Sequence, residues 1–509
     1  MSEISTARTF ADSWARTVSE HGARTFLLFE EPSGATATWT YAEFDRVLEG
    51  VADRLSSCDV KAGSAVHLAL ANSPAFVAVW LAANRMGAWI VPSDPMARRP
   101  ELADHLERTR PSVGLCAVNR ADVYRSALVD AGVAAEVIEV DEADASSLPS
   151  SGASYTDWVT PALSDRAAVM FTSGTTGRPK GVEITQANYA FAGKVMAEAS
   201  ELTVEDRQIV VLPLFHANAQ YYSFAPAIWS GASVALMHTF SASNFLSQCA
   251  RHSATAASLF AAPIRMILAR GEEVDGVRLR HCWYAQNVTG EQYEQLSRWL
   301  GCRPRQLYGM TETIPAVLTE VVDKPRHDSM GSVTEGCELQ LQDAEGRPVG
   351  VGEIGEIAVR GVPGETIFGG YLDDPVATTA SFRNGWFLSG DRARRDEDGR
   401  YYFDGRHSEV LKVAGENVST VEVEGVISTH PGVHEAAVLG APDPIRDEVP
   451  VAFVVPVDTE RGPSEEELRE WCEERLAKAK VPRSFTFLEE LPRTSVGKVR
   501  KFVLKESAG

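Results

Sequence analysis

The sequence lacks a long apolar segment. No stretch of 18 uncharged apolar residues occurs in it, and its opening residues, MSEISTARTFADSW, carry no apolar run. A membrane-spanning helix needs about 20 apolar residues, and a secretory signal has an apolar core of its own. We therefore expect no membrane span, no signal peptide and no membrane partner.

Cysteines are few and scattered. The seven cysteines include no CxxC pair, and the eleven histidines include no HExxH spacing. The sequence therefore indicates neither a disulfide framework nor a zinc site. We expect a protein of the reducing cytoplasm.

Positive charge is also in short supply. Lys and Arg number 49 against 70 Asp and Glu, which gives a net charge of −21. Because such a chain repels nucleic-acid backbones, no nucleic-acid partner is expected, and an anionic ligand has to be met by a local group of donors. With 509 residues, 44% of them apolar, the chain is long enough for more than one folded domain.

Short β-branched runs alternate with helical patterns, which indicates an α/β protein whose sheets are covered by helices. Apolar residues at helical spacing predict a helix over 41–55, and a second, almost wholly apolar helix is expected at about 75–87. Strands are expected at 65–70, 167–173, 209–214, 232–237 and 356–361.

The character of the sequence changes near residue 405. A polar, glycine-bearing stretch is followed by about 100 residues with their own pattern of strands at 436–441 and 451–457 and an acidic helix at 464–477. We predict a large N-terminal domain over 1–406 and a small α+β domain over 407–509. Residues 478–505 hold eight Lys and Arg against two Glu, either as a balance for the acidic helix or as a receiver of phosphates.

Residues 172–181, TSGTTGRPKG, carry the strongest chemical signal. Three glycines permit close approach of a ligand to the backbone, hydroxyls and amides can donate to anionic oxygens, and Lys180 adds a cation. The segment follows an apolar strand, and we expect a helix after it. It is interpreted as a phosphate cradle, although its spacing does not fit the Walker motif.

This segment resembles the signature loop of the adenylate-forming acyl-CoA synthetase superfamily, the AMP-binding enzymes. Further matches follow in the family's order: YGMTET at 308–313, SGD at 389–391 with Gly405 and Arg406, KVAG at 412–415, and PRTSVGK at 492–498. The wording of FHANAQYY at 215–222 and YAQNV at 284–288 is most similar to the carnitine/crotonobetaine-CoA ligase branch.

The resemblance implies ATP, Mg²⁺ and coenzyme A as ligands, and it implies roles for individual residues. Glu312 would ligate Mg²⁺, Thr311 would contact the α-phosphate, and Lys498 would bridge the substrate carboxylate and the α-phosphate. Asp391 would bind the ribose, Arg406 would bind the ribose or the phosphate, and Tyr308 would pack on the adenine. The remaining nucleotide-binding or cofactor-binding positions are Thr172, Ser173, Gly174, Thr175, Thr176, Gly177, Lys180, Gln286, Asn287 and Gly415.

The resemblance also implies an acyl pocket. His216 would stand at its mouth, and one helical face would direct Asn218 and Tyr222 into it. Met310, Pro315 and Ala316 would form another wall. These polar or bulky groups favour a small, polar or aromatic acid over a long alkyl chain.

Two positions depart from the family's pattern. Tyr284 to Val288 replace a Gly-Gly-Ala turn, so Gln286 and Asn287 have room to present side chains to the nucleotide or the substrate. Ser408 stands where relatives carry an Asp or Lys hinge. The hinge would let the C-terminal domain act as a mobile lid that offers first Lys498 and then the Lys412 to Asn417 loop to the site.

The sequence therefore predicts an ATP-dependent acid–CoA ligase that adenylates a small carboxylic acid and transfers the acyl group to the CoA thiol. Another acceptor, a carrier-protein thiol or an amine, and an inorganic acid such as nitrite remain alternatives. A nucleotide-binding regulator that has lost catalysis would show damage at Lys498, Glu312 or the phosphate loop, and all of these are intact.

Overall fold

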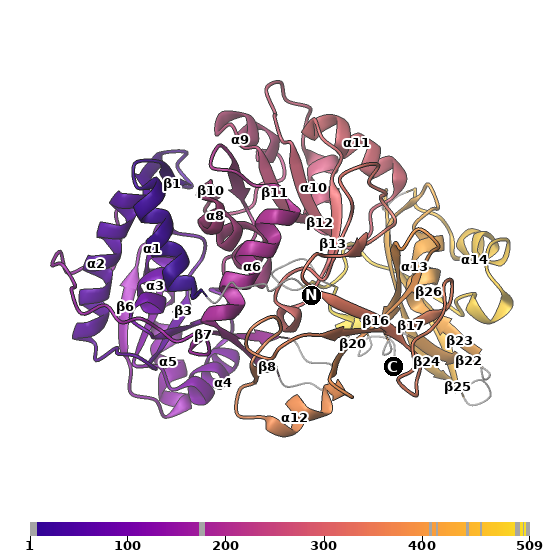
Figure 1. Ribbon diagram of the computed structural model, residues 1–509. Coiled ribbons are helices and arrows are strands. Elements are labelled where there is room, and N and C mark those ends of the chain that lie inside the picture. Colours follow the sequence, from indigo (N-terminus) through magenta and orange to yellow (C-terminus); the bar gives the residue numbers. More distant parts are fainter. Residues whose placement is uncertain are drawn as a thin grey trace. The chain divides into compact units, whose positions relative to one another are not determined.

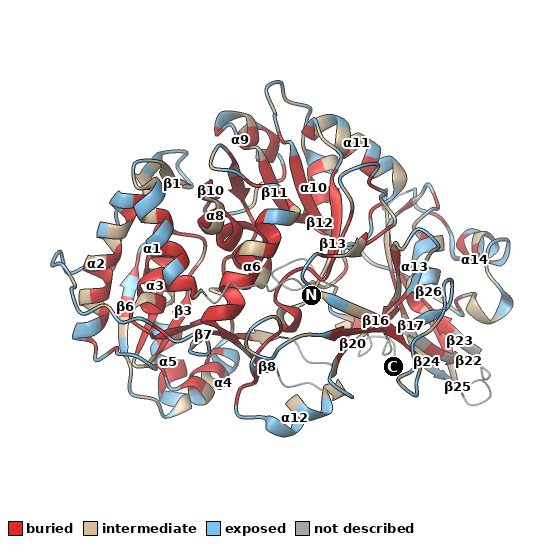
Figure 2. Ribbon diagram, viewed as in Figure 1, coloured by how far each residue is buried: buried red, intermediate tan, exposed pale blue. Residues whose placement is uncertain are grey.

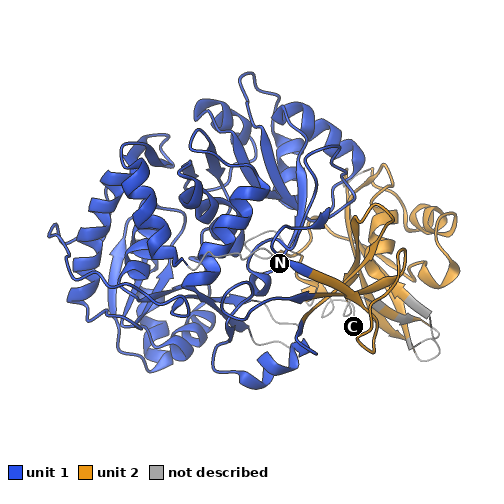
Figure 3. Cartoon of the chain, in the orientation of Figure 1, with its two compact units in different colours: residues 1–338, 359–386 blue, residues 339–358, 387–509 orange. Residues whose placement is uncertain are grey.

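The chain forms two compact units. The computed structural model describes residues 8–172, 179–406, 410–413, 416–443, 447–458, 461–493, 499–501 and 503–504. Unit 1 comprises 1–338 and 359–386, and unit 2 comprises 339–358 and 387–509 (Figure 3). Segments 339–358 and 387–406 thus group with the C-terminal part of the chain rather than with the body, while the boundary of the proposed mobile lid stays a prediction.

Unit 1 contains two large sheets. The strands of the first run in the order β15-β14-β13-β12-β11-β9-β10-β1-β2, and the five strands β9 to β13 run parallel to one another (Figure 1). The bounds are β1 Thr25–Glu30, β2 Thr36–Thr40, β9 Arg207–Val210, β10 Ser233–Met237, β11 Ala256–Phe260, β12 His281–Ala285, β13 Arg305–Tyr308, β14 Leu318–Thr319 and β15 Ser332–Val333.

The second sheet of unit 1 has the order β18-β8-β7-β4-β3-β5-β6. Its centre is parallel, whereas β8 runs antiparallel to β7 and β18 antiparallel to β8. The bounds are β3 Ala65–Ala69, β4 Trp89–Pro92, β5 Val113–Ala117, β6 Glu136–Val140, β7 Arg166–Thr172, β8 Lys180–Thr185 and β18 Gly370–Tyr371.

Two helices of unit 1 are buried around almost their whole circumference. They are α3 (Pro74–Arg85) and α6 (Gln186–Ala199), and both are coloured as buried in Figure 2. Helix α1 (Phe10–His21) joins them, because the ring of Phe10 stacks on Trp80 of α3 and on Tyr189 of α6 at 5.3 and 4.9 Å. A helix that is apolar all round needs such cover on several sides.

The other helices of unit 1 are amphipathic or short. In α2 (Tyr41–Ser57) and α11 (Gly290–Leu300) the buried residues fall on one face, and a Thr capping box begins each helix. The remaining bounds are α4 Arg99–Thr109, α5 Ala121–Ala131, α7 Ala217–Ala219, α8 Ala225–Ser230, α9 Phe245–Arg251, α10 Ala261–Arg270 and α12 Pro375–Ala380.

The segment after the glycine-rich loop differs from the expectation. Strand β8, and not a helix, follows Pro179, and Thr172 pairs with Lys180 across the β7–β8 ladder. The residues Val182, Ile184 and Thr185 are buried and β-branched, which favours a strand, and Thr185 then caps α6. The loop therefore connects two antiparallel strands.

Unit 2 combines a small sheet and an α+β fold. The small sheet pairs β16 (Glu338–Gln342), β17 (Ile354–Arg360), β20 (Trp386–Arg395) and β21 (Tyr401–Arg406). The other sheet has the order β23-β22-β25-β24 with β26 on β25, packed against α13 Thr420–Ile427 and α14 Glu465–Glu473. Its strands are β22 Val410–Val413, β23 Glu416–Ser419, β24 Val433–Asp443, β25 Asp447–Pro456 and β26 Phe485–Phe487.

Most of the expected elements are present, with shifted ends. The helix expected at 464–477 ends at Glu473. The strand expected at 209–214 ends at Val210; Pro213 follows, and the Leu214 amide donates a hydrogen bond to the Asn72 side chain. Among the described residues, no helix combines the length and apolar character that crossing a membrane requires.

Four of the eight cations in the basic segment at 478–505 pair with carboxylates within unit 2. Lys480 pairs with Glu422, Arg483 with Asp443, Arg493 with Glu435 and Lys501 with Glu424. These carboxylates belong to α13 and β24, not to the acidic helix α14. Positive charge in this segment is therefore paired with carboxylates on other elements of unit 2.

Candidate active site

A chain of three side chains links the end of the glycine-rich loop to the candidate magnesium ligand. The Lys180 ammonium lies 4.5 Å from the centre of the Tyr371 ring, and the Tyr371 hydroxyl donates a 3.0 Å hydrogen bond to Oε1 of Glu312. Burial, followed by the nearby Glu312 charge, raises the pKa of Tyr371, so the hydroxyl stays a donor. Lys180 and Glu312, far apart in the sequence, thus belong to one site.

Arg108 of α4 holds the flanks of the same loop. Its Nη1 donates a 2.7 Å hydrogen bond to the carbonyl of Pro179, and its guanidinium lies 4.8 Å from the centre of the Phe171 ring. His105 stacks on the same ring with centroids 4.0 Å apart. The residues on both sides of the loop are therefore anchored to one helix.

The YGMTET segment forms a 3₁₀ turn over Thr311–Thr313. The amide of Met310 donates to the Thr313 hydroxyl at 3.0 Å, and Glu312 is buried in the turn. The next residue, Ile314, has φ of 69°, a left-handed conformation that is rare for a β-branched side chain. The turn that carries Thr311 and Glu312 is thus followed by a strained residue.

The structure brings several predicted acyl-pocket residues together around Gly309. A Cβ added to Gly309 would lie 2.7 Å from the Tyr222 hydroxyl oxygen and 3.0 Å from the Pro315 carbonyl oxygen and the Ala316 Cα. Only glycine therefore fits beside Tyr222 at this point of the signature. Met310, half-buried, adjoins the same position.

Most buried amides are hydrogen-bonded within the protein, and Asn218 differs from them. Its side chain is 4% exposed, and neither Nδ2 nor Oδ1 has a hydrogen-bond partner among the described residues. It lies in α7, which begins after His216, and a π-helical turn at Gln220–Phe224 follows. An unpaired buried amide is costly, and π-turns are frequent at functional sites, so this segment is suited to receive a polar ligand group.

Gln286 and Asn287 lie directly after β12, and Tyr308 ends β13. Gln286 is exposed and has φ of 72°, so a side chain stands where the backbone favours glycine. Asn287 is exposed as well, but its Oδ1 accepts a 2.9 Å hydrogen bond from Gln306. Because β12 and β13 are parallel neighbours, all three predicted residues share one edge of the sheet.

Asp391 and Arg406 bind each other within unit 2. They are paired residues on β20 and β21, and Arg406 Nε donates a 2.7 Å hydrogen bond to Oδ1 of Asp391. The carboxylate is 3% exposed, whereas the Arg406 side chain is 42% exposed. The two candidate ribose residues thus form one charge-assisted pair.

Several predicted residues lie outside the described part of the chain. These are Ser173, Gly174, Thr175, Thr176, Gly177, Ser408, Gly415 and Lys498. Their predicted roles stay predictions. Thr172, at the edge of the loop, is described, and its hydroxyl donates a long 3.4 Å bond to the Lys180 carbonyl.

The residues present fit a magnesium ion that is held partly by its substrate. Glu312 offers hard carboxylate oxygens, and the described residues contain no group of three His, Cys, Asp or Glu that could hold a metal by themselves. Mg²⁺ typically takes one or two carboxylates and completes its shell with water and phosphate oxygens.

Comparison with known proteins gives the family. The AMP-binding enzyme family matches residues 14–372, and its C-terminal domain matches residues 422–498. The chain belongs to the AMP-binding enzymes. A crotonobetaine/carnitine–CoA ligase of Salmonella choleraesuis (strain SC-B67) is 34% identical over 506 residues, covering 97% of this chain and 98% of that protein.

Solved AMP-binding enzymes share the whole fold. The anthranilate CoA ligase AuaEII, in complex with anthranoyl-AMP, has a TM-score of 0.89 at 26% identity and covers 100% of this chain and 98% of its own. The o-succinylbenzoate CoA synthetase of Bacillus subtilis, in complex with ATP and a magnesium ion, has a TM-score of 0.83 at 28% identity and covers 97% and 99%. The protein is thus an enzyme of the AMP-forming acid–thiol ligase family.

Two residues of this AMP-binding enzyme's site were not predicted from the sequence. Tyr371 and Arg108 lie outside the quoted motifs, and each acts through a contact with a residue far away in the chain. The sequence offers one weak signal for Tyr371, the two glycines before it, because Gly370 has φ of 147° and marks a special turn. No comparable signal marks Arg108, which reads as an ordinary helix residue.

Proposed function

We propose that this enzyme adenylates a small carboxylic acid with ATP, releases pyrophosphate, and then transfers the acyl group to the thiol of coenzyme A. The supporting observation is the Lys180–Tyr371–Glu312 chain, in which Tyr371 joins a cation suited to phosphate oxygens to a carboxylate suited to Mg²⁺. The names of the relatives support the same class of reaction.

The first step needs charge neutralisation rather than a strong base. A carboxylic acid is already ionised near pH 7, so two anions have to be brought together while negative charge develops on pyrophosphate. Lys180 supplies one positive charge, and a bound Mg²⁺ would polarise the phosphate oxygens next to Glu312. Thr311 would donate its hydroxyl to the α-phosphate, and Tyr371 fixes the orientation of the Glu312 carboxylate.

The acyl pocket is proposed to select a small acid with a neutral polar group. Asn218 offers both a donor and an acceptor that the protein itself does not use among its described residues. Tyr222, on the same helical segment as Asn218, meets Pro315 and Ala316 around Gly309, which supports a small acid. An acid that lacks a polar group to pair with Asn218 would leave this buried amide without hydrogen bonds when it binds. The resulting cost in binding free energy would discriminate strongly against such an acid.

A pyrophosphate-exchange screen across small carboxylic acids tests the proposal. We expect exchange to depend on ATP, Mg²⁺ and one class of acid, with polar aromatic or short polar acids preferred over fatty acids. The screen is then repeated with CoA, amines and a carrier-protein thiol as acceptors, and with nitrite in place of the organic acid. CoA-dependent release of AMP supports the ligase, whereas an absence of exchange with every acid would contradict adenylation.

The acceptor arm separates the remaining alternatives. One outcome is pyrophosphate exchange with an acid, together with AMP release that depends on an amine or a carrier thiol and not on CoA. That outcome would support the adenylation step and would assign an acceptor other than CoA to the transfer step. Exchange with nitrite alone would assign an inorganic acid. Each outcome is read in the same assay with the same enzyme.

A further inference from the structure

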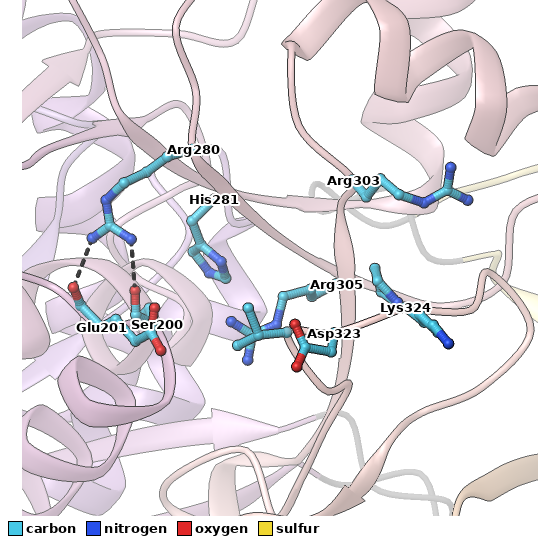
Figure 4. A pocket seen from close by; sticks show the side chains of 10 residues that line it. Ser200, Glu201, Arg280, His281, Arg303, Arg305, Asp323 and Lys324 are labelled. Carbon is cyan, nitrogen blue, oxygen red and sulfur yellow. Dashed lines mark hydrogen bonds between the residues drawn. The ribbon is translucent and has the colours of Figure 1, made fainter.

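A second cavity lies at the opposite ends of the strands that carry Gln286 and Tyr308. Its volume is about 540 Å³, within the usual range for small-molecule sites. It is lined at the amino ends of β12 and β13 and by the segment 322–325 after β14 (Figure 4). Since β12 has five residues, it separates the cavity from the nucleotide edge by roughly 16 Å.

Arg305 is the central cation of this cavity. Its side chain is buried, and its guanidinium donates to two backbone carbonyls, those of Glu320 at 2.8 Å and Ala199 at 2.9 Å. Neither acceptor carries a full charge, and Nη1 has no partner among the described residues. Burial lowers the pKa of Arg305 to about 10, which leaves it charged at neutral pH.

His281 supplies a second polar atom. It is 3% exposed, and its Nε2 has no hydrogen-bond partner among the described residues. Burial, followed by the nearby arginines, holds the pKa of His281 well below its usual range, so the ring is neutral. Figure 4 shows His281 and Arg305 in the middle of the lining, between the Ser200 and Glu201 segment and Asp323.

The other charges of the lining decide what kind of ligand fits. Arg280 is held by Asp206 and by the carbonyls of Ser200 and Glu201, and Arg303 is held by Glu294. Two exposed carboxylates, Glu201 and Asp323, belong to the lining. These carboxylates oppose a highly charged phosphate, whereas a ligand with a single carboxylate meets Arg305 at a lower electrostatic cost.

We propose that this cavity is a second ligand site, which binds a small organic carboxylate through Arg305 Nη1 and places a polar atom of the same ligand on Nε2 of His281. The site is distinct from the nucleotide edge and goes beyond the proposed ligase reaction. A planar guanidinium is suited to a carboxylate, and the partly desolvated position strengthens the bond.

Isothermal titration of the full-length protein tests the site, with lactate, citrate and inorganic phosphate as probes and saturating AMP to occupy the nucleotide edge. We expect saturable binding of lactate, which has one carboxylate and one hydroxyl, and weaker binding of citrate and phosphate. Arg305→Gln should weaken lactate binding by about tenfold or more, because it removes the charge while keeping a donor for the carbonyls. Unchanged pyrophosphate exchange in that variant would verify that it is folded.

Val322→Trp provides a variant that does not touch Arg305. Val322 lines the cavity and is 53% exposed, so tryptophan should fill the space and abolish binding. Val351→Trp, at a valine that is 49% exposed outside the cavity, is the matched control and should bind as the wild type does. Lactate binding that survives Val322→Trp belongs to the acyl pocket and overturns the proposal, as does an absence of saturable binding by every probe.

Discussion

The two ends of strands β12 and β13 carry different chemistry. At the carboxyl ends stand the neutral side chains of Gln286, Asn287 and Tyr308, and Gln286 has a left-handed backbone. At the amino ends stand arginines, of which Arg280 makes paired 2.7 and 2.6 Å hydrogen bonds to the Asp206 carboxylate. One edge of the sheet holds a strained backbone and neutral polar side chains, and the other holds closely paired charge.

This difference separates the residues that stabilise the fold from those that are suited to a reaction. Strained backbone and unsatisfied polar groups persist where function requires them, and they cost stability. Substitutions at the carboxyl edge should therefore reduce activity while leaving or raising stability. Substitutions in the paired charges at the amino edge should reduce stability and leave the reaction unchanged.

The largest expected effect is at Glu312. Glu312→Gln keeps an acceptor for Tyr371 but removes the charge that would hold Mg²⁺, so pyrophosphate exchange should fall on the order of 10²- to 10³-fold. Tyr371→Phe, which removes only the positioning bond, should cost about tenfold and raise the Mg²⁺ requirement. Exchange rates measured over a Mg²⁺ series check both, and a wild-type rate in Glu312→Gln would exclude this carboxylate from the site.

Asp206 should show the reverse pattern. Burial by itself raises the pKa of Asp206, but hydrogen bonds from Arg280, Thr203 and Thr255 outweigh it and bring the pKa down to about 2. From an ordinary value of 3.8, this shift corresponds to about 2 kcal/mol of folding stability, which Asp206→Asn should remove at pH 7.

The pH dependence of that effect has a definite sign. Because the folded pKa lies below the unfolded one, the contribution of Asp206 is complete above about pH 4 and is lost as the pH falls toward 2. Urea unfolding at several pH values should show the difference between wild type and Asp206→Asn narrowing over that window, with exchange activity at pH 7 unchanged. Asp130→Asn, in an exposed ion pair with Arg99, is the control and should leave stability unchanged.

Asn218→Leu should separate activity from stability. Replacing an unpaired buried amide with an apolar group of similar size should raise the free energy of unfolding by about 1–2 kcal/mol, while kcat/KM for the acid found in the screen falls. Asn188→Leu is the matched control, because Asn188 donates 2.9 Å bonds to the carbonyls of Glu365 and Ile367. That variant should be destabilised, and a loss of stability in both variants would show that Asn218 is paired in the folded protein.

The smallest effect is expected at Gln286. Residue 286 has a left-handed backbone, which costs a residue other than glycine about 1–2 kcal/mol in the folded state, and glycine removes this cost. Glycine also gives the unfolded chain more conformational freedom, which lowers the free energy of unfolding by about 0.5–1 kcal/mol. Gln286→Gly should therefore stabilise by about 0.5 kcal/mol, whereas Gln295→Gly inside α11 should destabilise by about 1 kcal/mol. Thermal unfolding of the two variants measures the contrast.

Much of the fold could be predicted because its signals are local. The spacing of apolar residues places α2 and α3, and β-branched runs place β3, β7 and β10 within one or two residues. The strand after the glycine-rich loop could not be foreseen, because its β character depends on a pairing with β7 and β18 that only the folded sheet supplies.

The candidate site divides in the same way. Glu312, Lys180 and Tyr308 stand in motifs whose residue types follow from the chemistry of phosphate and metal binding. Tyr371 and the unpaired amide of Asn218 could not be identified in this way, because a hydrogen bond, or the lack of one, between distant segments leaves no local pattern. The paired charges of Asp206 and Arg280 likewise leave no local pattern, because the two residues are 74 positions apart in the chain.

The position of β1 has a consequence for the synthesis of the chain. This largely buried strand pairs in parallel with β10, which follows it by roughly 200 residues, so at about 5–20 residues per second the ribosome takes about 10–40 s to make its partner. During that time Phe26, Leu27 and Phe29 have no sheet to enter. The newborn chain therefore exposes the apolar face of this hairpin until β10 is made, and slowing translation before residue 237 would lengthen that exposure.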